Sequence, residues 1–255
     1  AATDGGRGMI ASIWGWLSDP VNWGGPDGIP TRLLAHVRYS LIVLCAAAAI
    51  AVPLGLFIGH TGRARWLITA ANAARAVPTL GLLFALALWL GPRLSGDLAF
   101  TLPSILVLVV LAIPPLLAGA YAGVEAVDPA ARDAARGMGM RPLEVLRHVE
   151  IPAALPLLLS GVRAATLQVV ATATIAAYVG LGGLGRYLID GLAVGDYPAT
   201  ASGAVLVALL ALLADLVLAL LAHWVVSPGL TGRYRRGKES PARDVVPSTD
   251  RLNVR

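Results

Sequence analysis

Three charged side chains stand inside long apolar runs, and they are the first candidates for chemistry in this sequence. They are Arg75, Arg163 and Asp215. A charge in such a run is costly unless it faces protein or water, so each residue could serve a translocation path, and Asp215 a proton relay. Two alternatives stay open: the arginines can snorkel to an interface or bind carbonyl groups, and Asp215 can pair with an arginine or a helix terminus.

The remaining motifs for chemistry are weaker. Gly180, Gly182 and Gly185 have the spacing of a dinucleotide-binding loop, but they follow an apolar helix instead of a strand and therefore favour a helix break. The histidines, at positions 36, 60, 148 and 223, show no i, i+4 pair, so no metal site is expected. The sequence contains no Gly-x-x-x-x-Gly-Lys-Ser/Thr loop and no paired acids or Ser/His set, so we expect neither a catalytic residue nor a cofactor bound by this chain.

The composition places these residues in a membrane protein. The chain of 255 residues is 57% hydrophobic and 14% charged, whereas about a quarter of the residues in soluble domains are charged. The apolar runs are aliphatic and lack the alternation of a membrane barrel, so they are expected to be helices. Cys45 is the single cysteine, which excludes a disulfide framework and a thiolate metal cluster.

Five apolar runs are long enough to cross a bilayer, which requires roughly 20 apolar residues per helix. They cover residues 39–59, 66–91, 98–124, 153–179 and 199–226. The sequence therefore predicts an all-α membrane protein with five transmembrane helices. We expect residues 1–32 to form an extracytoplasmic or interfacial segment, residues 33–226 the transmembrane domain, and residues 227–255 a disordered cytoplasmic tail.

The distribution of Lys and Arg predicts the orientation. Thirteen of these residues flank the runs on one side and five on the other, which places the N-terminus outside and the C-terminus in the cytoplasm. The basic cluster at Arg233, Arg235, Arg236 and Lys238 directly follows the last run. It is therefore interpreted as a contact with anionic membrane lipid instead of nucleic acid.

The cytoplasmic segment 125–151 has the pattern of two short helices. Asp128 can cap the first helix with Pro129 in its first turn, and Gly137 and Gly139 end it. Pro142 begins the second helix, and Pro152 is expected to redirect the chain into the next span. An alanine face next to glycines suits docking into a groove of another protein.

This segment resembles the EAA loop of ABC importer permeases, which reads Glu-Ala-Ala, three residues, Gly, nine residues, Ile-x-Leu-Pro. Here the string is Asp133-Ala134-Ala135, then Gly139, then Val149-Glu150-Ile151-Pro152, with the same spacing throughout. In that family the loop is a coupling helix seated in a cleft of the ATPase subunit. The resemblance implies that the ATPase-coupling residues are Asp133, Ala134, Ala135, Gly137, Gly139, Val149, Ile151 and Pro152.

Other strings resemble the osmoprotectant branch of that family, which transports glycine betaine, carnitine, choline and proline. They are His36-x-x-Tyr39-Ser40-Leu41, Asn72-x-x-Arg75-Ala76-Val77-Pro78-Thr79 and Gly161-Val162-Arg163-Ala164-Ala165. The expected translocation path involves Asn72, Arg75, Pro78, Arg163, Gln168, Thr172 and Tyr178. For Gln168 and Thr172, hydrogen bonds that pack the helices are the equal alternative.

The resemblance implies a type I ABC importer permease fold in a bacterial inner membrane. It also implies separate ATPase subunits that bind ATP and Mg, a second permease copy or paralogue, and an extracellular or periplasmic solute-binding protein. Alternating access is the expected mechanism. Two other functions stay open: an ABC permease for another small solute such as an amino acid, and an ion-coupled secondary transporter that uses Asp215.

Overall fold

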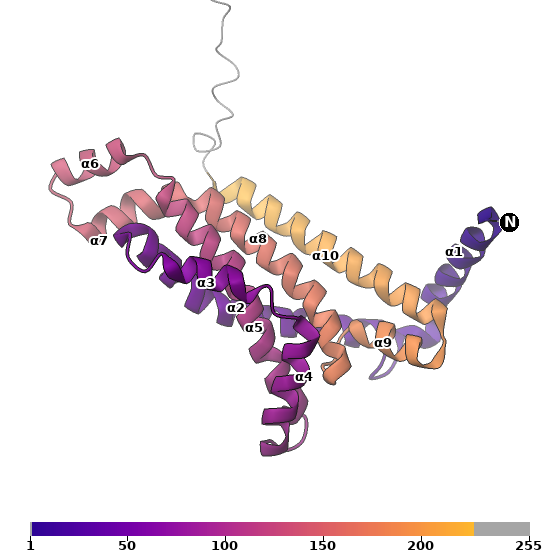
Figure 1. Ribbon diagram of the computed structural model, residues 1–255. Coiled ribbons are helices and arrows are strands. Elements are labelled where there is room, and N and C mark those ends of the chain that lie inside the picture. Colours follow the sequence, from indigo (N-terminus) through magenta and orange to yellow (C-terminus); the bar gives the residue numbers. More distant parts are fainter. Residues whose placement is uncertain (1, 227–255) are drawn as a thin grey trace, which may run out of the picture.

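The computed structural model describes residues 2–226, and within that range the regular elements are helices and no strand occurs (Figure 1). The predicted tail, residues 227–255, lies outside the described residues. The helices are α1 Ala2–Ser18, α2 Ile29–Thr61, α3 Trp66–Ala74, α4 Thr79–Leu90, α5 Leu98–Glu125, α6 Pro129–Gly137, α7 Pro142–Val145, α8 Ile151–Ala176, α9 Gly185–Val194 and α10 Tyr197–Val225.

Helix α5 forms the centre of the bundle, because α2 packs along one side of it and α8 along another. Small residues allow these contacts. A Cβ added to Gly55 of α2 would lie 2.8 Å from the Leu117 carbonyl oxygen of α5, and one added to Gly119 of α5 would lie 2.8 Å from the Cα of Gly161 in α8. The Gly-x-x-x-Gly pairs 55–59 of α2 and 119–123 of α5 therefore lie at helix crossings.

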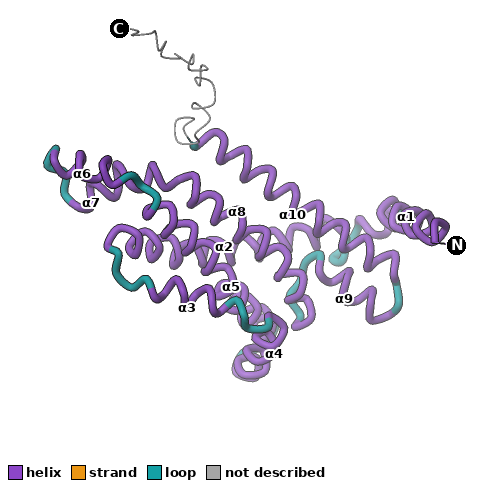
Figure 2. The backbone as a smooth tube through the Cα atoms, turned by 45° about the horizontal axis from the view of Figure 1, so that its top comes forward, coloured by secondary structure: helices purple, strands orange, loops and turns teal. Residues whose placement is uncertain are grey.

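Four helical stretches are long and apolar enough to cross a membrane, namely α2, α5, Pro142–Val179 and α10. Helices α3 and α4 together make a fifth only if they count as one broken span, because they are bent by 87°. The predicted run 66–91 is therefore divided between two helices. Pro78 has no N–H to donate and restricts Val77 before it, so the helix stops at Ala74 and restarts at Thr79 (Figure 2).

Two other boundaries differ from the prediction. Helix α2 begins at Ile29, ten residues before the predicted run, because Pro30 fits the first turn and the helix continues through Arg32 and Arg38. The predicted redirection at Pro152 is wrong, since the helical path is continuous from Pro142 to Val179. A π turn at Leu146–Glu150 ends two residues before Pro152 and absorbs the change in hydrogen bonding.

The glycine-rich stretch after α8 breaks the helix, as predicted. A short 3-10 turn ends at Gly180, and both Gly180 and Gly183 have positive φ angles, of +96° and +104°. Helix α9 then begins at Gly185 and packs against α10. The chain therefore turns at this point through backbone conformations that favour glycine.

The N-terminal segment is attached to α9 and α10 at the end of the molecule opposite α6 (Figures 1 and 2). The rings of Trp16 and Tyr187 meet edge to face with centroids 5.1 Å apart, and the Tyr187 hydroxyl donates to the carbonyl oxygen of Asp27 at 2.5 Å. Burial raises the pKa of Tyr187, so the phenol keeps the proton that it donates.

The glycine crossing between α5 and α8 generates a first prediction. Gly119→Leu should lower the thermal unfolding temperature of the detergent-purified protein, because overpacking a tight contact costs about 1–3 kcal/mol. Gly15→Leu in α1 is the matched control, since a Cβ at Gly15 has nothing within 4 Å. Equal unfolding temperatures for the two variants would contradict the close crossing.

Candidate functional site at the α6–α7 end of the bundle

Residues 125–151, here called the α6–α7 segment, form the two short helices that the sequence predicts. Asp128 caps α6 by accepting a hydrogen bond from the Ala130 N–H at 2.9 Å, and Pro129 occupies the first turn. After α6, Gly139 has a φ of +88°, which reverses the chain toward Pro142. The Arg141 N–H then donates to Glu144 Oε2 at 2.7 Å and secures the start of α7.

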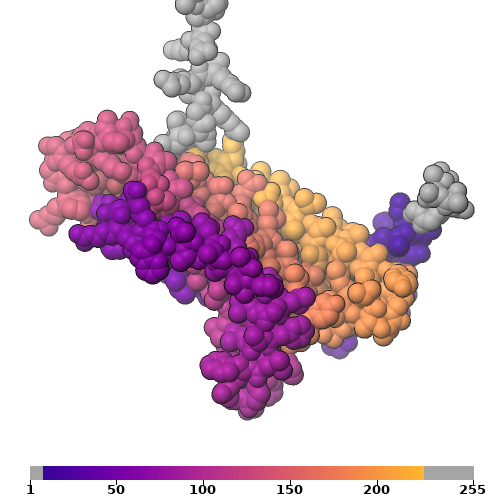
Figure 3. Space-filling view, viewed as in Figure 1, coloured from indigo at the N-terminus to yellow at the C-terminus, as the bar shows by residue number. Residues whose placement is uncertain are grey.

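The segment divides into an outward face and an anchored face. Asp133, Ala134, Gly137 and Gly139 are exposed, and Met138 between the two glycines is 73% exposed. Ala135 is buried against the rest of the molecule, and Val149 and Ile151 are half-buried. Pro152, although exposed, lies in the first turn of α8. Figure 3 shows the segment as one end of the molecule, where its outward face can meet another protein.

A buried carboxylate anchors the segment. Glu150 is 1% exposed, and its Oε2 lies 2.6 Å from Nδ1 of His60 in the last turn of α2. Its Oε1 lies 2.9 Å from Nε of Arg132 in α6. The Arg132 guanidinium also donates to the carbonyl oxygen of Val124 at the end of α5. One acid therefore joins three elements, and Arg132 adds α5 as a fourth.

These three residues were not among the sequence-predicted site residues. Glu150 stands at the variable position of the Val-x-Ile-Pro string, and His60 precedes it by 90 residues. The available signal was an acid placed between the apolar residues Val149 and Ile151 at the start of a span. Such an acid requires a partner when it is buried.

Arg163, one of the predicted path residues, is paired with Asp215. Arg163 Nε and Asp215 Oδ1 are 2.9 Å apart, and a second bond of 2.7 Å joins the guanidinium to Oδ2. This two-point geometry links α8 to α10. Asp215 is therefore paired with an arginine, as one of its two alternatives expected, and a role of Arg163 in a path stays a prediction.

Gln168 and Thr172 both donate side-chain hydrogen bonds to backbone carbonyl groups. Pro115 cannot donate to Leu111 four residues earlier, and the Gln168 side chain of α8 donates to that carbonyl oxygen at 3.0 Å. Thr172 is buried and donates to the Gln168 carbonyl oxygen of its own helix at 2.8 Å. The packing alternative therefore describes Gln168, which bonds to α5, whereas the Thr172 hydroxyl bonds within α8. A role of either residue in a translocation path stays a prediction.

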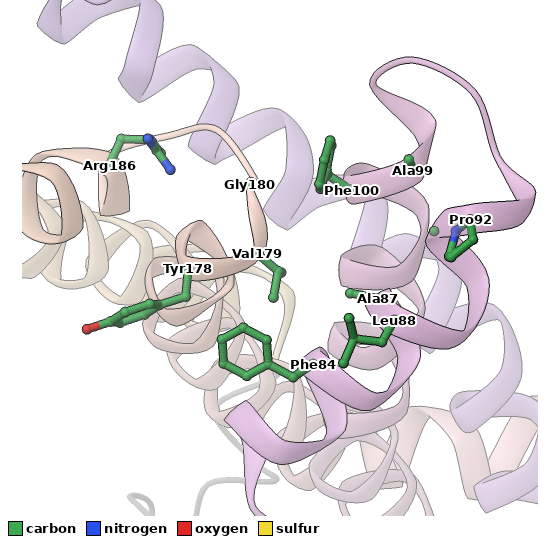
Figure 4. A pocket seen from close by; sticks show the side chains of 11 residues that line it. Phe84, Ala87, Leu88, Pro92, Ala99, Phe100, Tyr178, Val179, Gly180 and Arg186 are labelled. Carbon is green, nitrogen blue, oxygen red and sulfur yellow. The ribbon is translucent and has the colours of Figure 1, made fainter.

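The other predicted path residues lie at two separate places. Asn72, Arg75 and Pro78 are exposed at the α3–α4 break. Tyr178 lines a largely apolar hollow of ≈ 780 Å³, together with Phe84 and Phe100 (Figure 4). The seven path candidates therefore do not converge on one site within the described chain.

Comparison with known proteins decides the family. Residues 51–227, more than half of the chain, match the family described as "Binding-protein-dependent transport system inner membrane component". The chain belongs to this family. It is thus the inner-membrane permease component of an ABC importer, and ATP is hydrolysed by a separate subunit.

Several similar relatives are osmoprotectant permeases. The permease is 31% identical to the carnitine transport permease protein OpuCB of Listeria monocytogenes, over 80% of this chain and 90% of that protein. It is 32% identical to the glycine betaine/carnitine/choline transport system permease protein OpuCB of Bacillus subtilis, over 77% and 88% of the two chains. The sequence resemblance to this branch is thus confirmed at the level of the family.

Solved structures support the same fold. The permease superimposes on a chain of the inward-facing MetNI methionine ABC transporter with a TM-score of 0.68, covering 82% of this chain and 100% of that chain at 21% identity. A chain of an amino acid ABC transporter gives a TM-score of 0.61 at 20% identity, over 76% and 92% of the two chains. The all-helical architecture is therefore that of type I ABC importer permeases.

The Arg163–Asp215 link generates a second prediction. Arg163→Leu or Asp215→Leu alone should lower the unfolding temperature of the purified permease, because the remaining charge loses its partner. The double variant should lose less than the sum of the two single losses, since no unpaired charge remains. Thermal unfolding of all four proteins in detergent measures this. Strictly additive losses would show that the two charges do not interact.

Proposed function

We propose that this permease is the five-span subunit of an ABC importer for quaternary-ammonium osmoprotectants such as glycine betaine, choline and carnitine, with proline as a further candidate. The observation that carries the proposal is the set of relatives named for these solutes. Four of them, from Listeria and Bacillus, are 31–34% identical over 72–80% of this chain. An ABC permease for another small solute, such as an amino acid, is the alternative.

The proposed topology counts α3 and α4 as one broken span. Together with α2, α5, Pro142–Val179 and α10, this gives five crossings. An odd number agrees with the distribution of Lys and Arg, which predicts the N-terminus outside and the C-terminus in the cytoplasm. Residues 1–32 then lie at the outer face, and the α6–α7 segment lies in the cytoplasm.

Pairing with a second permease copy or a paralogue completes the proposed transporter. No residue in the most apolar stretch of α10 is fully buried within the described part of the chain, and α3 and α4 expose large side chains such as Trp66 and Phe84. Relatives of two types, OpuCB and OpuCD, are both named carnitine transport permease proteins in Listeria monocytogenes. A paralogous pair is therefore as compatible with these relatives as a homodimer.

In the proposed mechanism, each α6–α7 segment is seated on one ATPase subunit, which binds ATP and Mg. The exposed residues Asp133, Ala134, Gly137 and Gly139, with Met138, supply the contact. Closure of the ATPase pair moves the segments and rocks the helix bundles, so that access alternates between the cytoplasm and a solute-binding protein docked outside.

A third prediction tests the ATPase contact. Gly139→Arg should prevent the ATPase subunit from co-purifying with the permease, and should abolish transport, while membrane insertion persists. The reason is that nothing lies within 4 Å of a Cβ at Gly139, so the added side chain projects from the proposed contact.

Gly96→Arg is the matched control for this experiment. Gly96 also has a positive φ and nothing within 4 Å of its Cβ, but it lies directly before α5, away from the α6–α7 segment. Retention of the ATPase by Gly96→Arg and its loss from Gly139→Arg is the expected result. Retention of the ATPase by both variants would remove the docking role of Gly139.

A fourth prediction tests the solute class. The complex isolated from membranes should contain a binding protein whose unfolding temperature rises with glycine betaine, choline or carnitine, because a ligand stabilises the state that it binds. Proline and unrelated amino acids serve as comparison solutes in the same thermal assay. Stabilisation by an unrelated amino acid alone would replace the osmoprotectant assignment by the alternative. Uptake that follows an ion gradient without any ATPase would instead favour a secondary transporter.

A further inference from the structure

The feature that remains unexplained is the attachment of α6 to the membrane helices. Within the described chain, Ala135 is the buried residue of this nine-residue helix. A single alanine offers little apolar area, so burial alone holds α6 weakly. The contacts of Arg132 with Glu150 and with the Val124 carbonyl oxygen are therefore its main lateral attachment.

Glu150 connects this attachment to two long helices. It lies in the π turn that leads directly into α8, so it is part of the continuous stretch Pro142–Val179. Its second oxygen is held by His60 at the end of α2. Because the carboxylate is 1% exposed, water cannot replace a lost partner cheaply. Separating α6 from α2 and α8 would therefore leave the buried Glu150 carboxylate without its Arg132 partner, which is costly.

We propose that Glu150, His60 and Arg132 form an ionic clamp that transmits the displacement of α6 to α2, α5 and α8. The clamp residues are positioning residues: they hold the coupling helix to the bundle and do not contact the ATPase themselves. The proposal rests on the proposed function, in which the ATPase moves α6. It adds that efficient coupling of ATP hydrolysis to transport depends on this clamp.

The contact geometry selects the variants. Arg132→Met removes the ion pair with Glu150 and the hydrogen bond to Val124 while keeping a long apolar side chain. Arg132→Lys keeps the charge but lacks the planar fork that reaches Glu150 and Val124 together. His60→Asn retains a donor for Glu150, whereas His60→Leu does not.

Arg65→Met is the matched control. Arg65 forms the other arginine–glutamate pair at this end of the bundle, 3.3 Å from Glu125. This pair is exposed and does not include α6. Its removal should therefore leave the transmission of the α6 displacement to the membrane helices intact.

The experiment uses the complete complex of permease, ATPase subunits and binding protein in liposomes, with radiolabelled glycine betaine as the probe. Arg132→Met and His60→Leu should retain the ATPase subunit and its ATP hydrolysis. They should lower the glycine betaine transported per ATP roughly tenfold, a typical size for a coupling between sites. Arg132→Lys and His60→Asn should recover part of this ratio, whereas Arg65→Met should match the unmodified protein.

Hydrogen exchange provides a second measurement that does not depend on the solute. In the unmodified complex, trapping the ATPase with ATP and vanadate should change exchange in α6, in the π turn and at the start of α8. In Arg132→Met the change should be confined to α6. If Arg132→Met fails to fold, the milder Glu150→Gln replaces it, because this variant keeps the shape of the side chain. The same confinement of the exchange to α6 is expected for it.

The outcomes separate the two proposals. An unmodified permease that does not retain an ATPase subunit would overturn the proposed function. Normal transport per ATP in Arg132→Met, or an unchanged spread of hydrogen exchange into α8, would overturn the clamp alone. A lower unfolding temperature with an unchanged transport ratio would likewise overturn it, because that result describes a purely structural contact.

Discussion

The close approach of α5 to α2 and α8 is the constraint on which the rest of the fold depends. In a bilayer, apolar side chains gain little by leaving lipid, so helices associate where their backbones can come near one another. Gly55 on α2 and the pair Gly119 and Gly161 between α5 and α8 provide these places. The three helices therefore form a fixed unit, and the remaining elements are attached to it.

The prolines of α5 leave backbone carbonyl groups unpaired, and a side chain of the neighbouring helix α8 pairs one of them. Helix α5 contains Pro103, Pro114 and Pro115, each of which leaves a carbonyl group without its usual donor. An unpaired carbonyl group is expensive within a membrane. Gln168 of α8 supplies the donor for Leu111, and this is possible because the glycine crossing holds α8 so close. Packing and hydrogen bonding thus support each other along one interface.

The sequence was sufficient to predict the features that depend on local chemistry. The predicted run 98–124 matches α5, and Asp128, Pro129 and Gly139 define the short helices because capping and turn preferences act over a few residues. The clamp could not be found in this way. His60 and Glu150 are 90 residues apart, and only the packing of α2 against the start of α8 brings them together.

Hydropathy did not predict the bend between α3 and α4. The run 66–91 is apolar enough for one span, but hydropathy measures the transfer of side chains to lipid and carries no information on the 87° bend before Thr79. That bend leaves Asn72, Arg75 and Pro78 exposed. Tyr178, which lines the largely apolar hollow, lies 100 residues after Pro78 in the sequence. Under the proposed pairing, a second permease must complete any path that these residues line. In that proposal the path residues are a property of the assembled pair, whereas the residues of the proposed clamp all lie within one chain.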